Sequence, residues 1–229
     1  MTSNALITIS VAVCLAVLGG CASRVTINNL NIPDPLIKKI PISVAVKFPD
    51  EFEHFVHKEK TLGREKWTID LGRSNTLLFT KLLEALFNEV IVLDDSVDPL
   101  DIPTWMDFID IDAVIAPSID AFEFSIPSQN QADFFAVWVR YRIKIFDREG
   151  QQFANWLISA YGKSQKSTTV SGDDPLHHAA VLAMRDAAAL ILIQLDKATG
   201  ISSLNREPLS NVTTNSTPAM SESALQNPK

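Results

Sequence analysis

Apolar and polar positions alternate most regularly between Phe134 and Phe146, and this period of two indicates a β-strand with one buried face. The apolar positions on one face are Val137, Val139, Tyr141, Ile143 and Ile145. The opposite face carries Trp138, Arg140, Arg142 and Lys144. Residues 113–126 are also predicted to be extended, and the turn at residues 147–150 returns the chain as a strand over 153–161. The pattern therefore predicts a meander of three antiparallel strands.

A helical period occurs twice. The first helix follows a break and an N-cap at residues 72–74 and ends near Asn88, with a wide apolar stripe. The second begins at Asp174 and Pro175, an N-cap followed by proline at the first helical position, and runs to about Lys197. The alanines that would let this helix lie close to a sheet are Ala179, Ala180, Ala183 and Ala187.

Two shorter segments, residues 41–48 and 89–93, are predicted to be strands, and residues 66–71 are predicted to be a short strand or an extended segment. Together with the meander and the two helices they give an order of strands and helices that is typical of an α+β fold. We expect a mostly antiparallel sheet with the two main helices packed on one face.

The N-terminal segment from Ala5 to Leu18 is apolar over 14 residues. A membrane-spanning helix needs about 20 such residues, whereas a secretory signal peptide needs only about 7–15 followed by small residues. The following residues, Leu18, Gly19, Gly20 and Cys21, resemble the lipobox of bacterial lipoproteins. This resemblance implies cleavage before Cys21 and attachment of diacylglycerol to its thiol. Ala22 and Ser23 lack the aspartate that such proteins use for inner-membrane retention, so we expect the outer membrane.

The chain accordingly divides into four predicted parts: a signal peptide over 1–20, the lipidated cysteine and a tether over 21–40, a periplasmic α+β domain over 41–200, and a disordered tail over 201–229. This layout is similar to that of small periplasm-facing outer-membrane lipoproteins, including the lipopolysaccharide-assembly lipoprotein and the activators of penicillin-binding proteins. Auxiliary lipoproteins of ABC-type lipid transporters are similar in size and placement. The resemblance implies a role in the cell envelope.

Composition and charge exclude several other classes. The 46% hydrophobic and 21% charged residues suit one globular domain with flexible ends. Lys and Arg number 20 against 27 Asp and Glu, so the net charge of −7 argues against nucleic acid as a partner. The only other cysteine, Cys14, lies in the segment to be removed, so no disulfide is expected.

The basic strand face made of Trp138, Arg140, Arg142 and Lys144 is the candidate partner-binding face. An exposed row of cations beside an indole could contact an anionic partner or a lipid headgroup. The alternative is that the same cations pair across the sheet with neighbours such as Asp120 and Glu123, which would neutralise them. The sequence leaves both interpretations open.

No catalytic motif is present: the chain has no GxSxG, HExxH, Walker-type or GxGxxG sequence. His54 and His57 have a spacing that could suit zinc, but a third histidine is missing nearby, so we expect no metal and no cofactor. We therefore expect no enzyme, although a hydrolase built from distant residues stays as one alternative.

The leading interpretation is a non-catalytic binding or assembly module of the envelope, with a membrane anchor and an envelope protein as partner. A second alternative is a carrier of lipid or another small molecule, or an auxiliary component of an envelope transport system. The carrier needs an apolar pocket, which would be lined by Phe79, Phe87, Phe122 and Phe124.

Overall fold

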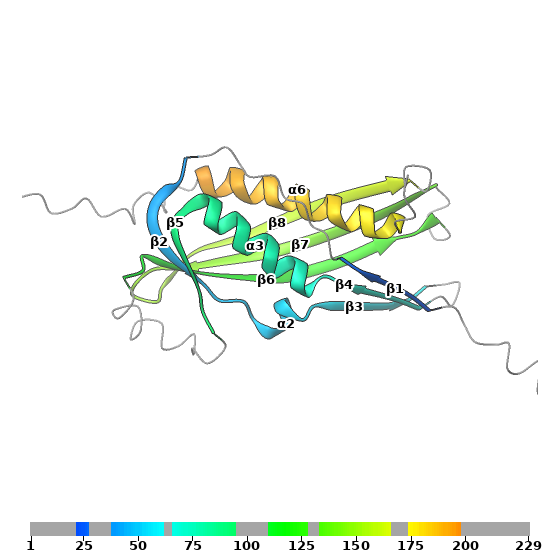
Figure 1. Ribbon diagram of the computed structural model, residues 1–229, viewed down its shortest axis with the longest axis horizontal. Helices are drawn as coiled ribbons and strands as arrows, with labels where there is room; N and C mark the ends of the chain where they lie inside the picture. The colour runs from blue at the N-terminus through cyan, green and yellow to red at the C-terminus, as the bar shows by residue number, and fades with distance from the viewer. Residues whose placement is uncertain are drawn as a thin grey trace, which may run out of the picture.

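The computed structural model describes residues 22–27, 38–61, 66–94, 110–127, 133–165 and 174–197. The predicted signal peptide, the lipobox from Leu18 to Cys21 and the predicted tail lie outside these ranges. In chain order the elements are β1 (Ala22–Thr26), β2 (Ile40–Val46), α2 (Asp50–Glu53), β3 (Val56–Lys60), β4 (Lys66–Asp70), α3 (Gly72–Leu86), β5 (Phe87–Val92), β6 (Ala113–Ser125), β7 (Phe134–Phe146), β8 (Gln152–Gln165) and α6 (Pro175–Lys197), as Figure 1 shows.

The strands form two sheets. The larger sheet has five strands in the order β5-β2-β6-β7-β8, and the smaller has three in the order β1-β4-β3. The long strands β6, β7 and β8 are antiparallel, which confirms the predicted meander and the α+β class. Three pairs that the sequence did not predict are parallel, namely β2 with both β5 and β6, and β1 with β4. The antiparallel pair of β3 with β4 was not predicted either, because no strand was expected over residues 56–60.

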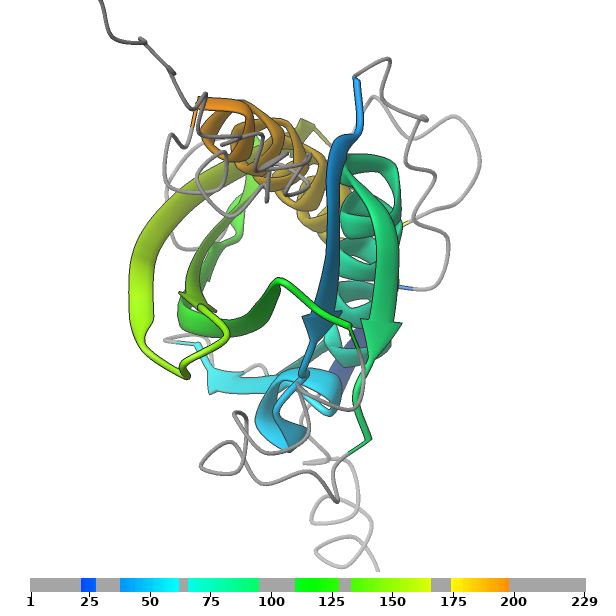
Figure 2. The ribbon, with the colours of Figure 1, turned by 90° about the vertical axis from the view of Figure 1, so that its left-hand side faces the viewer.

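The two main helices lie on one face of the larger sheet. Viewed along the long axis in Figure 2, the long strands curve around the core, and α6 and α3 lie on their concave side. We call this the inner face of the sheet and the opposite side the outer face. α6 packs against β8 and β7 and also contacts α3, which fulfils the expectation of two helices on one face.

The sequence analysis predicted that residues 22–26 belong to a tether, and this prediction is wrong. They form β1, which pairs in parallel with β4 from Ala22 opposite Lys66 to Thr26 opposite Asp70. Val25 is buried in the core, and so is Ile27, whose carbonyl oxygen accepts a hydrogen bond from the Ser74 hydroxyl. The folded domain therefore begins at Ala22 and not at residue 41, because these apolar side chains complete the core beside α3 and α6.

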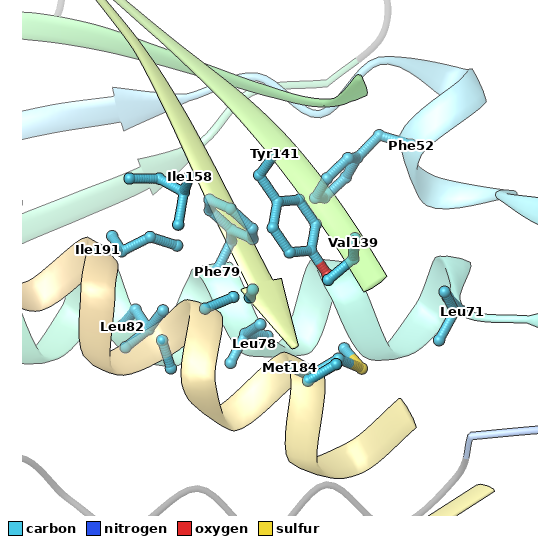
Figure 3. Packing of buried hydrophobic residues seen from close by; sticks show 14 of the residues in the cluster. Phe52, Leu71, Leu78, Phe79, Leu82, Val139, Tyr141, Ile158, Met184 and Ile191 are labelled. Atoms are coloured by element: carbon cyan, nitrogen blue, oxygen red, sulfur yellow. The ribbon is translucent and has the colours of Figure 1, made fainter. Parts of the chain in front are cut away.

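The core lies between the inner face of the larger sheet, the helices and the smaller sheet. Figure 3 shows Tyr141 of β7 near Phe52 and Phe79, with Leu78 and Met184 among the surrounding side chains. The Tyr141 ring lies 6.3 Å from Phe52 and 5.4 Å from Phe79, centroid to centroid, in edge-on contacts that suit aromatic pairs. The four alanines predicted to bring α6 close to the sheet are all buried.

α6 is long and apolar enough to cross a bilayer by length and composition over Pro175–Gln194. Half of that window is buried inside the domain, where it contacts β7 and β8. The helix comes close to the sheet at Gly162 of β8, where a Cβ atom would lie 2.0 Å from the carbonyl oxygen of Ala179. The apolar composition of α6 is thus used for packing in the core.

Candidate functional site

A β-bulge in β6 shapes the outer face of the sheet. The register shifts between Ile119, which lies opposite Tyr141, and Ala121, which lies opposite Arg140. The extra residue is Asp120, and after it Phe122 and Phe124 turn into the core. Bulges commonly redirect a side chain in this way. Here the bulge leaves an exposed carboxylate on the outer face, beside the basic row of β7.

Asp120 binds two of the predicted cations. Its Oδ2 accepts a hydrogen bond of 2.6 Å from Nε of Arg140, and its Oδ1 accepts one of 3.0 Å from Nε of Arg142. The hydrogen bond from Arg142, and then that from Arg140, holds the pKa of Asp120 below its usual value. One carboxylate faces two guanidinium groups, so cross-strand pairing reduces the positive charge of this row without removing it.

The other residues of the basic strand face have different neighbours. Trp138 lies opposite Glu123 of β6 and Tyr161 of β8, and its ring centroid is 5.1 Å from that of Tyr161. Lys144 lies opposite Asn155 of β8. The ion pairs of the described residues join Asp120, and not Glu123, to this row. The cross-strand pairing considered from the sequence is therefore confirmed for Asp120, whereas the bulge that presents both oxygens of Asp120 to the two arginines leaves no local sequence signal.

A hollow of about 260 Å³ lies on the outer face beside these residues. Its lining includes the small residues Ala121 and Ser159, with Trp138, Arg140 and Glu123 among the larger ones. Pockets for drug-sized ligands have about 300–1,000 Å³, so this hollow is smaller than such a pocket. Its lining combines apolar residues with one cation, Arg140, and one anion, Glu123.

β8 adds apolar residues that the sequence analysis did not single out. Phe153, Leu157 and Tyr161 are spaced four residues apart on its outer face and are 36%, 48% and 39% exposed. Because the inward positions of β8 are also apolar, the alternation did not reveal which face was solvated. β8 is an edge strand, and the Tyr161 amide donates a hydrogen bond of 3.0 Å to Asp186 of α6. That carboxylate caps the free edge at this point.

The phenylalanines suggested for a lipid pocket and the histidines considered for zinc do not line the outer hollow. Phe79, Phe87, Phe122 and Phe124 are buried core residues on the inner side and do not line the outer hollow. His54 pairs with Asp50 at 2.9 Å, and His57 contacts Glu59 at 3.2 Å. Within the described ranges, no group of three His, Cys, Asp or Glu side chains could hold a metal ion.

The sequence matches no protein-family model and no curated protein. Solved structures with a similar arrangement include protein XCC0632 from Xanthomonas campestris, with a TM-score of 0.45, 13% identity, and coverage of 76% of this chain and 98% of that chain. Lipoprotein GNA1162 from Neisseria meningitidis has a TM-score of 0.32 and 16% identity, over 67% of this chain and 99% of that one. The structural neighbours therefore include a bacterial lipoprotein.

Proposed function

We propose that this protein is a lipid-anchored, non-catalytic binding module of the bacterial cell envelope, held by Cys21 in the outer membrane and facing the periplasm. The lipobox motif from Leu18 to Cys21 supports the anchor. The observation that carries the binding role is the arrangement on the outer face, where Asp120 fixes Arg140 and Arg142 beside the exposed Leu157. The partner is an envelope protein with an acidic and apolar contact surface.

Asp120 gives the arginines a defined geometry before a partner arrives. An arginine has five N–H donors, and Asp120 receives only some of those of Arg140 and Arg142. A carboxylate of the partner can therefore bind the same pair of guanidinium groups, while Leu157 supplies apolar contact area. The anchor keeps protein and partner at the same membrane, which raises their effective concentration.

The test is site-specific photocrosslinking in native membranes, with the full chain carrying the crosslinking residue at position 157. The matched control carries it at Ile193, which is 50% exposed on α6, on the other side of the sheet. We expect one discrete protein adduct from position 157 and none from 193. Equal adducts from both positions, or none from 157, would contradict a partner on the outer face.

Two variants separate the parts of this proposal. Arg140→Ala combined with Arg142→Ala is expected to remove the adduct while the protein stays in the membrane fraction. Cys21→Ala is expected to release the protein from that fraction and to lack acyl mass. Retention of Cys21→Ala in the membrane would show that the anchor is not at this cysteine.

A further inference from the structure

No linker separates Cys21 from the folded domain. β1 begins at Ala22, the next residue, and is paired with β4 along its whole length. If Cys21 carries a lipid, as the proposed function requires, then the sulfur of Cys21 lies at the bilayer surface. The end of the domain at which β1 begins is therefore held against the membrane.

The strands of the larger sheet that end there can be identified from their pairing. Ser23 of β1 lies opposite Trp67 of β4, and the Trp67 ring is 5.9 Å from the ring of Phe124 in β6. Phe124 lies opposite Val137 of β7, which in turn lies opposite Gly162 of β8. These five residues mark a common level along the long axis, and Figure 1 shows that β1 begins at the end where β7 begins and β8 ends.

Counting from this level shows how far each strand reaches toward the membrane. Ala22 is one residue before Ser23, and Phe134 is three residues before Val137. At about 3.3 Å per residue these steps correspond to about 3 and 10 Å. Phe134 at the start of β7 therefore extends at least as far toward the anchored end as Ala22, the residue that follows the lipidated cysteine.

The outer face near this end has the residue types of a bilayer interface. The aromatic end patch consists of Phe134, Trp138, Tyr161 and Lys163. The Lys163 ammonium lies 4.0 Å from the centre of the Phe134 ring. Trp138 and Tyr161 are 42% and 39% exposed. Tryptophan and tyrosine favour the headgroup region, and lysine can bury its stem while its charge stays in water.

We propose that the aromatic end patch lies in the headgroup region of the bilayer that holds Cys21, so that the domain docks end-on against the membrane. This inference rests on the proposed lipid anchor. Because Glu123 lies opposite Trp138, the patch has no net excess of cations, and its contact does not need anionic lipid. The occupant of the patch is thus the interface of a zwitterionic bilayer, whereas the protein partner binds further along the outer face.

The experiment uses the full lipidated protein reconstituted in phosphatidylcholine vesicles that contain brominated acyl chains, which quench nearby indoles. The chain has four tryptophans, so the contribution of one is found by comparing wild type with Trp138→Phe. We expect bromine to quench wild type more strongly than Trp138→Phe, by up to one quarter of the total emission, which is the share of one indole in four. High salt is expected to leave the difference unchanged.

The matched control moves the indole away from the anchored end. Leu157→Trp in the Trp138→Phe background places it on the same outer face, four residues beyond Tyr161, or about 13 Å. We expect no additional quenching from this position. Equal quenching at 138 and 157 would overturn end-on docking in favour of a sheet that lies flat on the membrane. Thermal unfolding of each variant shows that it is folded.

Mass spectrometry of the same samples separates the two proposals. If Cys21 is acylated and wild type and Trp138→Phe are quenched equally, the docking inference is wrong and the lipid anchor stands. If Cys21 carries no acyl chain, the proposed anchor fails, and the docking inference fails with it.

Discussion

The Tyr141 hydroxyl donates a hydrogen bond of 2.7 Å to Oδ1 of Asn75, which joins the middle of β7 to the first turn of α3. Both residues are completely buried. Among the described residues, Asn75 Nδ2 has no hydrogen-bond partner, so the bond from the Tyr141 hydroxyl satisfies only the Oδ1 atom of the Asn75 side chain. A polar bond inside an apolar core fixes how the helix sits on the sheet.

Replacing Tyr141 by phenylalanine should therefore destabilise the protein. The substitution leaves Oδ1 of Asn75 buried without its donor, which costs about 1–3 kcal/mol in the free energy of unfolding. Urea denaturation of the full chain measures this change. Tyr161→Phe, on the exposed outer face, is the control and should stay within about 0.5 kcal/mol of wild type. Equal effects of both substitutions would show that the buried bond contributes nothing.

The same tyrosine should make the protein sensitive to alkaline pH. Burial raises the pKa of Tyr141 above its ordinary value, because the phenolate is poorly solvated in the core. The unfolded phenol titrates near pH 10, so the stability from the protonated folded form is complete below about pH 10 and is lost as pH rises above it. The free energy of unfolding should fall less steeply above that pH in Tyr141→Phe.

Phenolate absorbance checks this prediction directly, because the chain has only two tyrosines. In wild type, ionisation of Tyr141 should coincide with unfolding as followed by circular dichroism. Tyr161→Phe should keep this coupled step, and Tyr141→Phe should lack it. A Tyr141 signal that appears before unfolding would contradict the buried environment.

Gly162 should tolerate no side chain. A Cβ atom there would lie 2.0 Å from the Ala179 carbonyl oxygen and 2.4 Å from the Ala183 amide nitrogen, both backbone atoms of α6. Gly162→Ala must push the helix away from β8, at a cost of about 1–3 kcal/mol. Thermal unfolding tests this, with Ser159→Ala on the outer face of the same strand as the control. An unchanged midpoint for Gly162→Ala would mean that α6 is not packed this closely.

The sequence predicted elements whose pattern is local and long. β7 and α6 were placed at their observed bounds, because the alternation from Val137 to Ile145 and a cap followed by proline are strong signals. β8 extends further than predicted, to Gln165, since Gly162 interrupts the apolar pattern but allows α6 to come close. The α+β class followed from these elements.

What the sequence did not reveal depends on contacts between distant residues. β1 has only five residues, and its burial becomes evident when β4, α3 and α6 are assembled around it. The parallel pairs of β2 join segments that are far apart in the chain. The candidate site was predicted in part: the basic row of β7 is where the sequence placed it, but the bulge at Asp120 and the apolar row of β8 required the register.

Asp120 should contribute to stability only above acidic pH. Its pKa is lowered in the folded state, mainly by the hydrogen bonds from Arg142 and Arg140. The contribution is therefore present above the unfolded value near 3.9 and is lost as pH falls through the lower folded value. In Asp120→Asn the difference from wild type should be largest at neutral pH and should shrink in acid. Denaturation at several pH values tests this, and a constant difference would contradict the ion pairs.

The last prediction concerns β1, which decides how close the domain lies to its anchor. Val25 is 3% exposed, whereas the side chain of Arg24 beside it is 70% exposed and makes one ion pair of 3.8 Å with Asp70. If β1 is part of the domain, Val25→Ala removes two buried methyl groups and should cost about 1–3 kcal/mol. Arg24→Ala should cost at most about 1 kcal/mol, because exposed ion pairs contribute little. Chemical denaturation measures the free energy of unfolding of both variants, whose substitutions lie in the same strand. If residues 22–26 were a loose tether, both substitutions would leave stability unchanged, and the lipid anchor would no longer hold the aromatic end patch at the membrane.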